Sequence, residues 1–376
     1  MVAALTLAGC GSKGKAKLPA KLISVSHPLV RPDEVWSRGI GKGGGGYFSD
    51  LRVALAEDAL FTAAENGRVE ALEPKTGKVL WSIRVKARLI SGPSLDGDAV
   101  LLGTLDGEVI ALKRADGGQL WRSRAPSEAL APPVGAGDIV VAKAVDGREY
   151  GLDAASGERK WSFDRNEPSL SLRGLSTPLI VGRRIYTGLD NGKLVCLNLE
   201  DGTLVWEQTI SVPTGRGDLD RLTDIDADLL AAPGGNGLYV VSYGGDLSMI
   251  DLGSGDSSWH RSIKSYSGMV LGGNKLFVTD DEGTVWALDA QTGAALWKQQ
   301  ELKYRRLSPP GYLQGYVVVA DYKGYLHWLS ESDGKIVGRT RFGSVPFTAP
   351  PVAGDDLLYV MNTEGKLAAY SARPEK

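Results

Sequence analysis

The stretch Ala71-Leu-Glu-Pro-Lys-Thr-Gly-Lys-Val-Leu-Trp81 returns later in the chain as Ala287-Leu-Asp-Ala-Gln-Thr-Gly-Ala-Ala-Leu-Trp297. In both copies a Thr-Gly pair, typical of a turn, separates an apolar run from a second run that ends in tryptophan. The same frame ends at four further tryptophans, and in one more copy glycine stands in that place: Trp121, Trp161, Trp206, Trp259 and Gly338. A unit that recurs about every 40 residues predicts a repeat architecture.

Each copy of the frame also contains a glycine that ends one short apolar run and begins another. These glycines are Gly67, Gly107, Gly147, Gly192, Gly245, Gly283, Gly324 and Gly365, spaced 40, 40, 45, 53, 38, 41 and 41 residues apart. The first four follow Asn or Asp, and these dipeptides favour type I′ hairpin turns, in which both central residues have positive φ. The pattern predicts eight hairpins, with type I′ turns at these four glycines.

Four short strands in each period of about 40 residues are typical of propeller blades. No window shows sustained helical periodicity. We therefore predict an all-β fold over residues 31–376, an eight-bladed β-propeller of four-stranded antiparallel blades. The eighth copy stops near Tyr370, whereas Val35-Trp36 has no hairpin of its own. An N-terminal strand around Trp36 is thus predicted to complete the last blade, which removes open sheet edges.

The tryptophans of the frame are predicted to be structural. A buried indole removes about 150–250 Å² from water, so each would dock between adjacent blades. Replacing one with alanine would cost roughly 3–5 kcal/mol. This role is assigned to Trp36, Trp81, Trp121, Trp161, Trp206, Trp259 and Trp297.

Composition excludes several classes of function. Lys and Arg number 43 against 45 Asp and Glu, and a formal net charge of −2 provides no broad field for nucleic acid. The chain has two cysteines, Cys10 and Cys196, which excludes a disulfide framework or a Cys-rich metal site. The histidines His27, His260 and His327 show no metal-ligand spacing. We predict no metal, no cofactor and no catalytic residue.

The N-terminus has the features of an exported, lipid-anchored protein. Residues 1–9 are apolar enough for a signal peptide, and Leu7-Ala8-Gly9-Cys10 is similar to the lipobox of bacterial lipoproteins. We expect Cys10 to carry lipid, including palmitate, and a flexible tether to follow as far as residue 30. No Lys or Arg precedes the apolar run, so we expect the natural start further upstream. Ser12, where inner-membrane lipoproteins carry Asp, favours the outer membrane.

The repeat is interrupted at two consecutive connections between blades. From a framed tryptophan to the next hairpin strand the chain normally runs 17 to 19 residues, but Trp161 to Ile185 takes 24. The next connection, from Trp206 to Leu238, takes 32. Both join neighbouring blades in the same way, so both are expected on one face. Function in repeat proteins tends to reside in such interruptions.

The contents of the two insertions favour a protein interface. The first contains Ser169-Leu-Ser-Leu-Arg-Gly174 and the second contains Asp218-Leu-Asp-Arg-Leu-Thr-Asp-Ile-Asp226. Leucines beside arginine and carboxylates are typical of binding surfaces. Two alternatives stay open. The second loop could pair Arg221 with its own aspartates, or its alternating aspartates could bind Ca²⁺, although the glycine and glutamate of an EF-hand loop are absent.

These motifs, together with Gly324-Tyr-Leu-His-Trp328, resemble the BamB family, the propeller lipoproteins of the outer-membrane β-barrel assembly (BAM) machinery. The resemblance covers essentially all of the chain after the tether. It implies a non-enzymatic scaffold, anchored in the outer membrane and facing the periplasm, that binds the POTRA domains of BamA within the BAM complex. Such a scaffold assists delivery and insertion of barrel precursors, and unfolded outer-membrane proteins are further candidate partners. The family's contacts to BamA correspond here to Leu170, Leu172, Arg173, Asp224 and Asp226.

Two other functions are compatible with parts of the sequence. The repeat frame also resembles that of pyrroloquinoline-quinone-dependent dehydrogenases, but many of those enzymes use adjacent cysteines, and Cys196 stands alone in a strand. No insertion is large enough to cover a cofactor pocket. A general periplasmic chaperone or cell-wall-binding module is the remaining alternative.

Overall fold

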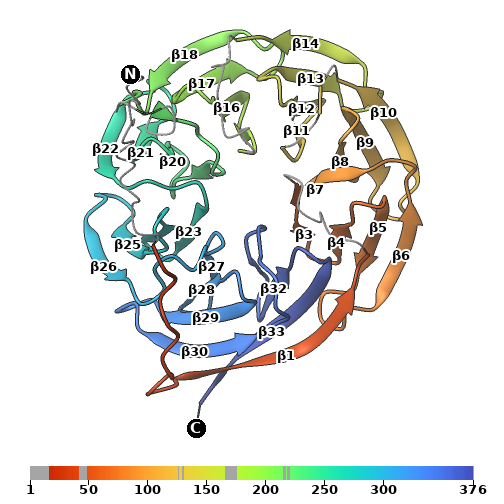
Figure 1. The fold of residues 1–376 in the computed structure, drawn as a ribbon. Coiled ribbons are helices and arrows are strands. Elements are labelled where there is room, and N and C mark those ends of the chain that lie inside the picture. Colours follow the sequence, from red (N-terminus) through yellow and green to blue (C-terminus); the bar gives the residue numbers. More distant parts are fainter. Residues whose placement is uncertain are drawn as a thin grey trace, which may run out of the picture.

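The computed structural model describes residues 17–41, 49–125, 127–128, 131–165, 176–214, 217 and 221–375. In this part of the chain the strands form eight sheets, which are arranged in a ring around a central axis (Figure 1). Within each sheet, consecutive strands of the chain pair antiparallel. The predicted eight-bladed β-propeller is therefore confirmed.

Each blade uses four strands, which run in chain order from the axis outwards in blades 1 to 7. Blades 1 to 4 consist of β3 (Val53–Leu55), β4 (Leu60–Ala63), β5 (Arg68–Leu72), β6 (Val79–Arg84); β7 (Leu89–Asp96), β8 (Ala99–Thr104), β9 (Glu108–Lys113), β10 (Gln119–Arg124); β11 (Val134–Ala136), β12 (Ile139–Lys143), β13 (Glu149–Asp153), β14 (Arg159–Phe163); and β15 (Leu179–Val181), β16 (Arg184–Gly188), β17 (Lys193–Asn198), β18 (Leu204–Thr209). Blades 5 to 7 consist of β19 (Leu230–Ala231), β20 (Gly237–Val241), β21 (Asp246–Asp251), β22 (Ser257–Ser262); β23 (Gly268–Gly272), β24 (Lys275–Thr279), β25 (Val285–Asp289), β26 (Ala295–Gln299); and β27 (Gly311–Leu313), β28 (Tyr316–Ala320), β29 (Tyr325–Ser330), β30 (Ile336–Arg341).

Blade 8 joins the two ends of the chain. Its inner strands are β31 (Val352–Ala353), β32 (Leu357–Met361) and β33 (Lys366–Pro374), and its outer strand is β1 (Val30–Gly39). Trp36 lies opposite Ala369 in the antiparallel pairing of β1 with β33. Figure 1 shows β1 running along the outside of β33, so the predicted closure by an N-terminal strand is confirmed.

The hairpin turns between the second and third strands differ from the predicted type. The amide of Gly67 donates to Ala64 O (3.0 Å) and the amide of Ala64 donates to Arg68 O (2.9 Å), so three residues form the loop. Gly67 has a φ of 85°, but Asn66 is not among the non-glycine residues with positive φ. The prediction of type I′ turns was therefore wrong. A three-residue loop needs the left-handed conformation only at its last position, which glycine supplies.

The framed tryptophans join each blade to the next. Each indole lies against the glycine of the following blade's turn between strands three and four, where an added Cβ would come within 3 Å of the ring. The contacting pairs are Trp36 with Gly77, Trp81 with Gly117, Trp121 with Gly157, Trp161 with Gly202, Trp206 with Gly255, Trp259 with Gly293 and Trp297 with Gly334. In blade 7, Gly338 takes the place of the tryptophan and lies against Val30 at the start of β1.

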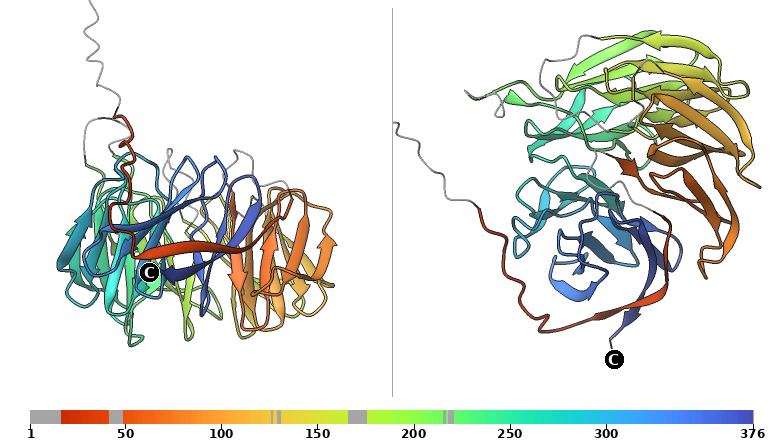
Figure 2. Two further views of the ribbon diagram at one scale, coloured as in Figure 1. Left: turned by 90° about the horizontal axis from the view of Figure 1, so that it is seen from below. Right: turned by 45° about the vertical axis from the view of Figure 1, so that its right-hand side comes forward.

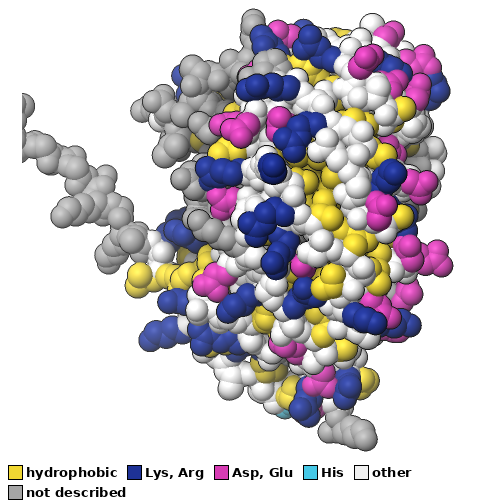
Figure 3. All heavy atoms as spheres, turned by 90° about the vertical axis from the view of Figure 1, so that its right-hand side faces the viewer, with side chains coloured by type: hydrophobic (Ala, Val, Ile, Leu, Met, Phe, Trp, Pro, Cys, Tyr) yellow, Lys and Arg dark blue, Asp and Glu magenta, His cyan; other side chains and the backbone are white. Residues whose placement is uncertain are grey.

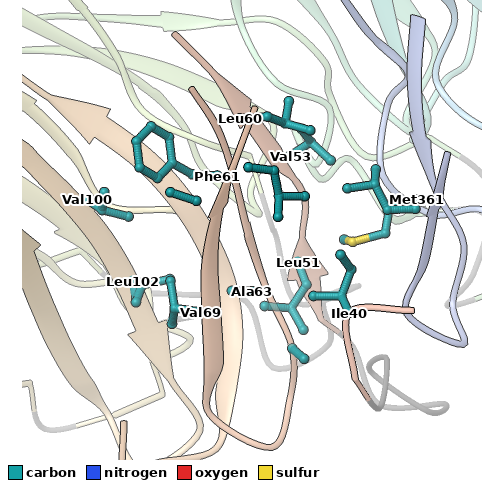
Figure 4. Close-up of a cluster of buried hydrophobic side chains, with 14 of the residues drawn as sticks. Ile40, Leu51, Val53, Leu60, Phe61, Ala63, Val69, Val100, Leu102 and Met361 are labelled. Carbon is teal, nitrogen blue, oxygen red and sulfur yellow. The ribbon is translucent and has the colours of Figure 1, made fainter. Parts of the chain in front are cut away.

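The hydrophobic core is distributed between the blades. One buried cluster unites blade 1 with its two neighbours, and Figure 4 shows Ile40, Leu51 and Met361 pointing toward one another within it. Ile40 follows β1, whereas Met361 ends β32, so this cluster also fixes the closed seam of the ring. The outer strands instead expose apolar side chains such as Leu80 and Leu120 (54% and 43% exposed). Figure 3 views this side, where apolar side chains are interspersed with charged ones.

The segment before β1 runs along blades 6 and 7. The amide of Ala20 donates to Lys303 O (2.9 Å), and the amide of Leu29 donates to Val337 O (2.9 Å). Figure 2 (left panel) shows this red segment rising above one face of the ring. In the described part of the chain, no helix has the length and apolar character required to cross a membrane.

Candidate functional site

The turns between second and third strands lie on the same face of the ring as the connections between blades. The amide of Val85, after β6, donates to Gly67 O (2.8 Å), and the amide of Ile210, after β18, donates to Gly192 O (2.9 Å). We call this side the connector face. The two long connections, here the first connector (residues 164–178) and the second connector (residues 210–229), both begin there.

The sequence-predicted site residues fall partly within the described chain. Leu170, Leu172, Arg173 and the lipidation site Cys10 lie outside the described residues. Asp224 is fully buried, whereas Asp226 is only partly buried. Asp226 is therefore the more accessible of the two carboxylates, and the partner-binding role of all five residues stays a prediction.

The end of the second connector is held between two hairpin turns. The amide of Tyr243, in the turn of blade 5, donates to Asp224 O (2.8 Å). The amide of Ile225 donates to Leu189 O in the turn of blade 4 (3.4 Å), and Ile225 is fully buried. Gly188 leaves room for it, because a Cβ there would lie 2.2 Å from Ile225 Cγ2. This packing fixes the positions of the aspartates on either side of Ile225.

Three carboxylates meet at this point. Asp190, from the hairpin turn of blade 4, Asp224 and Asp226 each offer an oxygen, and these oxygens lie within 4.8 Å of one another. We call them the carboxylate cluster. The buried ammonium of Lys143, at the end of β12, lies beside it and donates to Gly188 O (2.7 Å) and Ser176 Oγ (3.1 Å). Blades 3 and 4 and both long connectors thus contribute to one partly buried polar site.

Burial and mutual repulsion disfavour the state in which all three carboxyl groups of the cluster are ionised. Burial, together with repulsion from Asp224 and then Asp190, raises the pKa of Asp226 to about 7, while Lys143 acts in the opposite direction. Three carboxylates lie together here among the described residues, and carboxylate oxygens are ligands that Ca²⁺ accepts. The ammonium of Lys143 next to the site, however, repels a cation. The residues present therefore fit a retained proton better than Ca²⁺.

Replacing Asp226 with asparagine is expected to stabilise the protein in a pH-dependent way. Because the pKa of Asp226 is raised from its ordinary 3.8 to about 7, its contribution to stability is complete below about pH 4, declines as the pH rises, and is lost above pH 7. The full difference corresponds to about 4 kcal/mol, which we halve because the side chain is partly exposed. Asp226→Asn should therefore match the wild type near pH 4 and exceed it by about 2 kcal/mol at pH 8 in urea unfolding.

Asp106→Asn provides the control, because Asp106 belongs to the hairpin turn of blade 2, away from the cluster. The stability gained by Asp226→Asn, measured relative to this control, should grow between pH 4 and pH 8. If it does not, the cluster does not hold a proton.

Sequence reasoning missed several residues around the connectors. Val212 and Tyr266 are 65% and 44% exposed, and the ring of Tyr266 lies tilted against that of Tyr243, with 6.3 Å between the ring centroids. Exposed aromatic and aliphatic side chains beside a polar site are typical of binding surfaces. The one available sequence signal was Lys143, a charged residue at the end of the apolar run Ile139-Val-Val-Ala142. Asp190 gave no signal, because hairpin turns commonly contain aspartate.

The fold places the chain in the class of eight-bladed β-propellers, and comparison with known proteins places it within that class. The family described as "Outer membrane protein assembly factor BamB" matches residues 33–109, 65–299 and 289–374. A protein of that name from Alkalilimnicola ehrlichii is 47% identical over 98% of this chain and 95% of its own length. The chain belongs to the BamB family of outer membrane protein assembly factors.

Solved structures agree with this placement. The crystal structure of BamB from Moraxella catarrhalis superimposes with a TM-score of 0.82 at 26% identity, covering 91% of this chain and all of that one. A quinohemoprotein alcohol dehydrogenase from Pseudomonas putida also superimposes, with a TM-score of 0.71 over 90% of this chain and 76% of its own. That enzyme is only 12% identical, so the likeness concerns the fold alone.

Proposed function

We propose that this chain is a non-enzymatic scaffold of outer-membrane protein assembly that uses its connector face to bind the POTRA domains of BamA. The observation that carries the proposal is that both long connectors begin on one face of an otherwise regular ring, and that the described end of the second connector contributes to the carboxylate cluster. A scaffold needs a rigid frame with a distinct surface, and the closed propeller supplies the frame.

The chemistry of the connector face supports a protein partner. Arg173 is of a residue type that is enriched among the side chains carrying most of the binding energy at interfaces. Leu170 and Leu172 add apolar groups next to it in the sequence. Val212, within the second connector, and Tyr266, which follows blade 5, add exposed apolar surface, and Asp226 adds a carboxylate. A partner with apolar groups and at least one cation would complement this face.

Replacing Leu172 or Arg173 with alanine is expected to weaken binding to BamA by about 1–3 kcal/mol each, because central apolar and arginine anchors carry most of the binding energy. The melting temperature should barely change, since connector residues do not close the ring. The measurement is titration of a purified POTRA fragment of BamA with each variant.

Leu296→Ala and Arg122→Ala are matched controls, because both residues lie on the outer strands of blades 6 and 2, which the two long connectors do not join, and Leu296 is 50% exposed. If the Leu172→Ala, Arg173→Ala double variant binds as tightly as these controls, the binding surface lies elsewhere.

We also propose that the chain is held at the outer membrane by lipid on Cys10, facing the periplasm. The described segment that begins at Lys17 contacts the connector face. Lys17 Nζ pairs with Oε1 of Glu282 (2.5 Å), and Glu282 lies in the turn between β24 and β25 on that face. Arg305, after β26, donates from Nη1 to Ala20 O (2.9 Å). An anchor upstream of Lys17 would thus direct the connector face toward the membrane in which barrels are assembled.

A further inference from the structure

A single arginine reaches across the central channel of the ring. The short strand β2 (Asp50–Leu51) pairs parallel with β7 on the axis side of blade 2, and the amide of Arg52 donates to Gly92 O (3.0 Å). From this position Arg52 Nη1 donates to Asp228 Oδ2 (2.7 Å), two residues before the innermost strand of blade 5. Blades 3 and 4 separate the two residues around the ring, so the ion pair spans the channel.

The carboxylate of Asp228 joins the ends of both long connectors. Its Oδ2 accepts from Arg52, while its Oδ1 accepts from the amide of Thr177 (2.8 Å). Thr177 lies at the end of the first connector, two residues before β15, and Asp228 lies at the end of the second. Asp226 of the carboxylate cluster is only two residues upstream of Asp228 in the same connector.

Arg52 also separates two negative charges. Its Nε donates to Asp50 Oδ1 (3.0 Å), and its guanidinium makes a second contact to the other oxygen of Asp50. Burial raises the pKa of Asp50, and repulsion from Asp228 adds to this effect, whereas Arg52 acts against both. Burial alone would raise the pKa of Asp228 as well, but Arg52 and the Thr177 amide lower it. Without the arginine, two carboxylates would face each other in the channel, and the connector end would be pushed away.

We propose that Arg52 is a positioning residue of the binding surface: through Asp228 it fixes the ends of both long connectors relative to each other from the opposite side of the ring. This inference rests on the proposed function of the connector face. Arg52 itself lies in the channel, with its side chain 17% exposed, and acts on the partner through the connectors.

The test uses the full chain with Arg52→Met, which keeps the length of the side chain and removes its charge. Hydrogen exchange followed by mass spectrometry should show amides of residues 176–181 and 221–231, including Thr177, exchanging at least tenfold faster. Affinity for a purified POTRA fragment of BamA should fall about tenfold. Arg52→Lys restores the charge and should recover most of the affinity. Asp228→Asn, which keeps an acceptor for Thr177, serves as the second variant if Arg52→Met does not fold.

Arg122→Met is the matched control, because Arg122 pairs with Glu108 (3.0 Å) on the outer strands of blade 2. Unchanged exchange of the connector ends in both Arg52→Met and Asp228→Asn would overturn the inference. Faster exchange with an affinity equal to that of the control would also overturn it, since the contacts would then not position the surface. If the wild type does not bind the POTRA fragment but the exchange result is as expected, the proposed function is wrong. Arg52 would then hold the connector ends in place without serving a POTRA-binding surface.

Discussion

Replacing Trp121 with alanine should lower the free energy of unfolding by about 3–5 kcal/mol. Its indole is 5% exposed, donates from Nε1 to Ala154 O (2.8 Å), and lies against Gly157 of the next blade. Alanine would leave a cavity between blades 2 and 3 and would remove the donor to the partly buried Ala154 O, and both effects destabilise the fold. Equilibrium unfolding in guanidinium chloride, followed by far-UV circular dichroism, measures the loss.

The neighbouring residue provides a matched control for this variant. Leu120 lies on the same strand but is 43% exposed, so Leu120→Ala removes little buried surface and should cost well under 1 kcal/mol. Similar losses for the two variants would show that the indole does not join the blades.

Deleting the chain up to and including Gly39 should abolish the folded monomer. The deletion removes β1, including Val30 (1% exposed) and Trp36, whose Nε1 donates to Pro74 O of blade 1 (2.9 Å). Strand β33 would become an open edge, which favours association between chains. The expected loss is on the order of 5–10 kcal/mol, comparable with the total stability of a typical domain. Size-exclusion chromatography and thermal unfolding report the outcome.

Two further samples make this deletion interpretable. A chain that begins at Pro28 retains β1 and should stay a folded monomer. A synthetic peptide of residues 28–41, added to the longer deletion, should restore cooperative unfolding by pairing with β33. If the deletion without peptide unfolds like the chain that begins at Pro28, β1 is not needed to close the ring.

The architecture was predictable because its determinants are local and repeated. The spacing of the turn glycines gave the number of blades, and the unpaired Val35-Trp36 indicated the closing strand. The turn type was missed because Asn66-Gly67 by itself does not reveal the loop length. The observed hydrogen bond from the Ala64 amide to Arg68 O sets a three-residue loop.

The candidate site was predictable only in part. Asp224 and Asp226 lie close together because they are two residues apart in one connector. That this connector reaches the hairpin turns of blades 4 and 5 follows from its place between those two blades. Asp190, Lys143 and Arg52 join the site from other blades. Their positions depend on how the closed ring curves, and no local pattern in the sequence contains that information. The burial of Asp224 has the same origin.

Each framed indole packs against a glycine of the blade that follows it in the chain, and this one-way arrangement affects the order in which the blades can pack during synthesis. As the chain emerges from its N-terminus, Trp81 is covered once Gly117 arrives, and Trp121 is covered once Gly157 arrives. Apolar surface awaiting its neighbour is thereby limited to about one blade at a time, which reduces the opportunity for misassembly. Only the pairing of β1 with β33 cannot form until synthesis ends, because β33 is the last strand to be made.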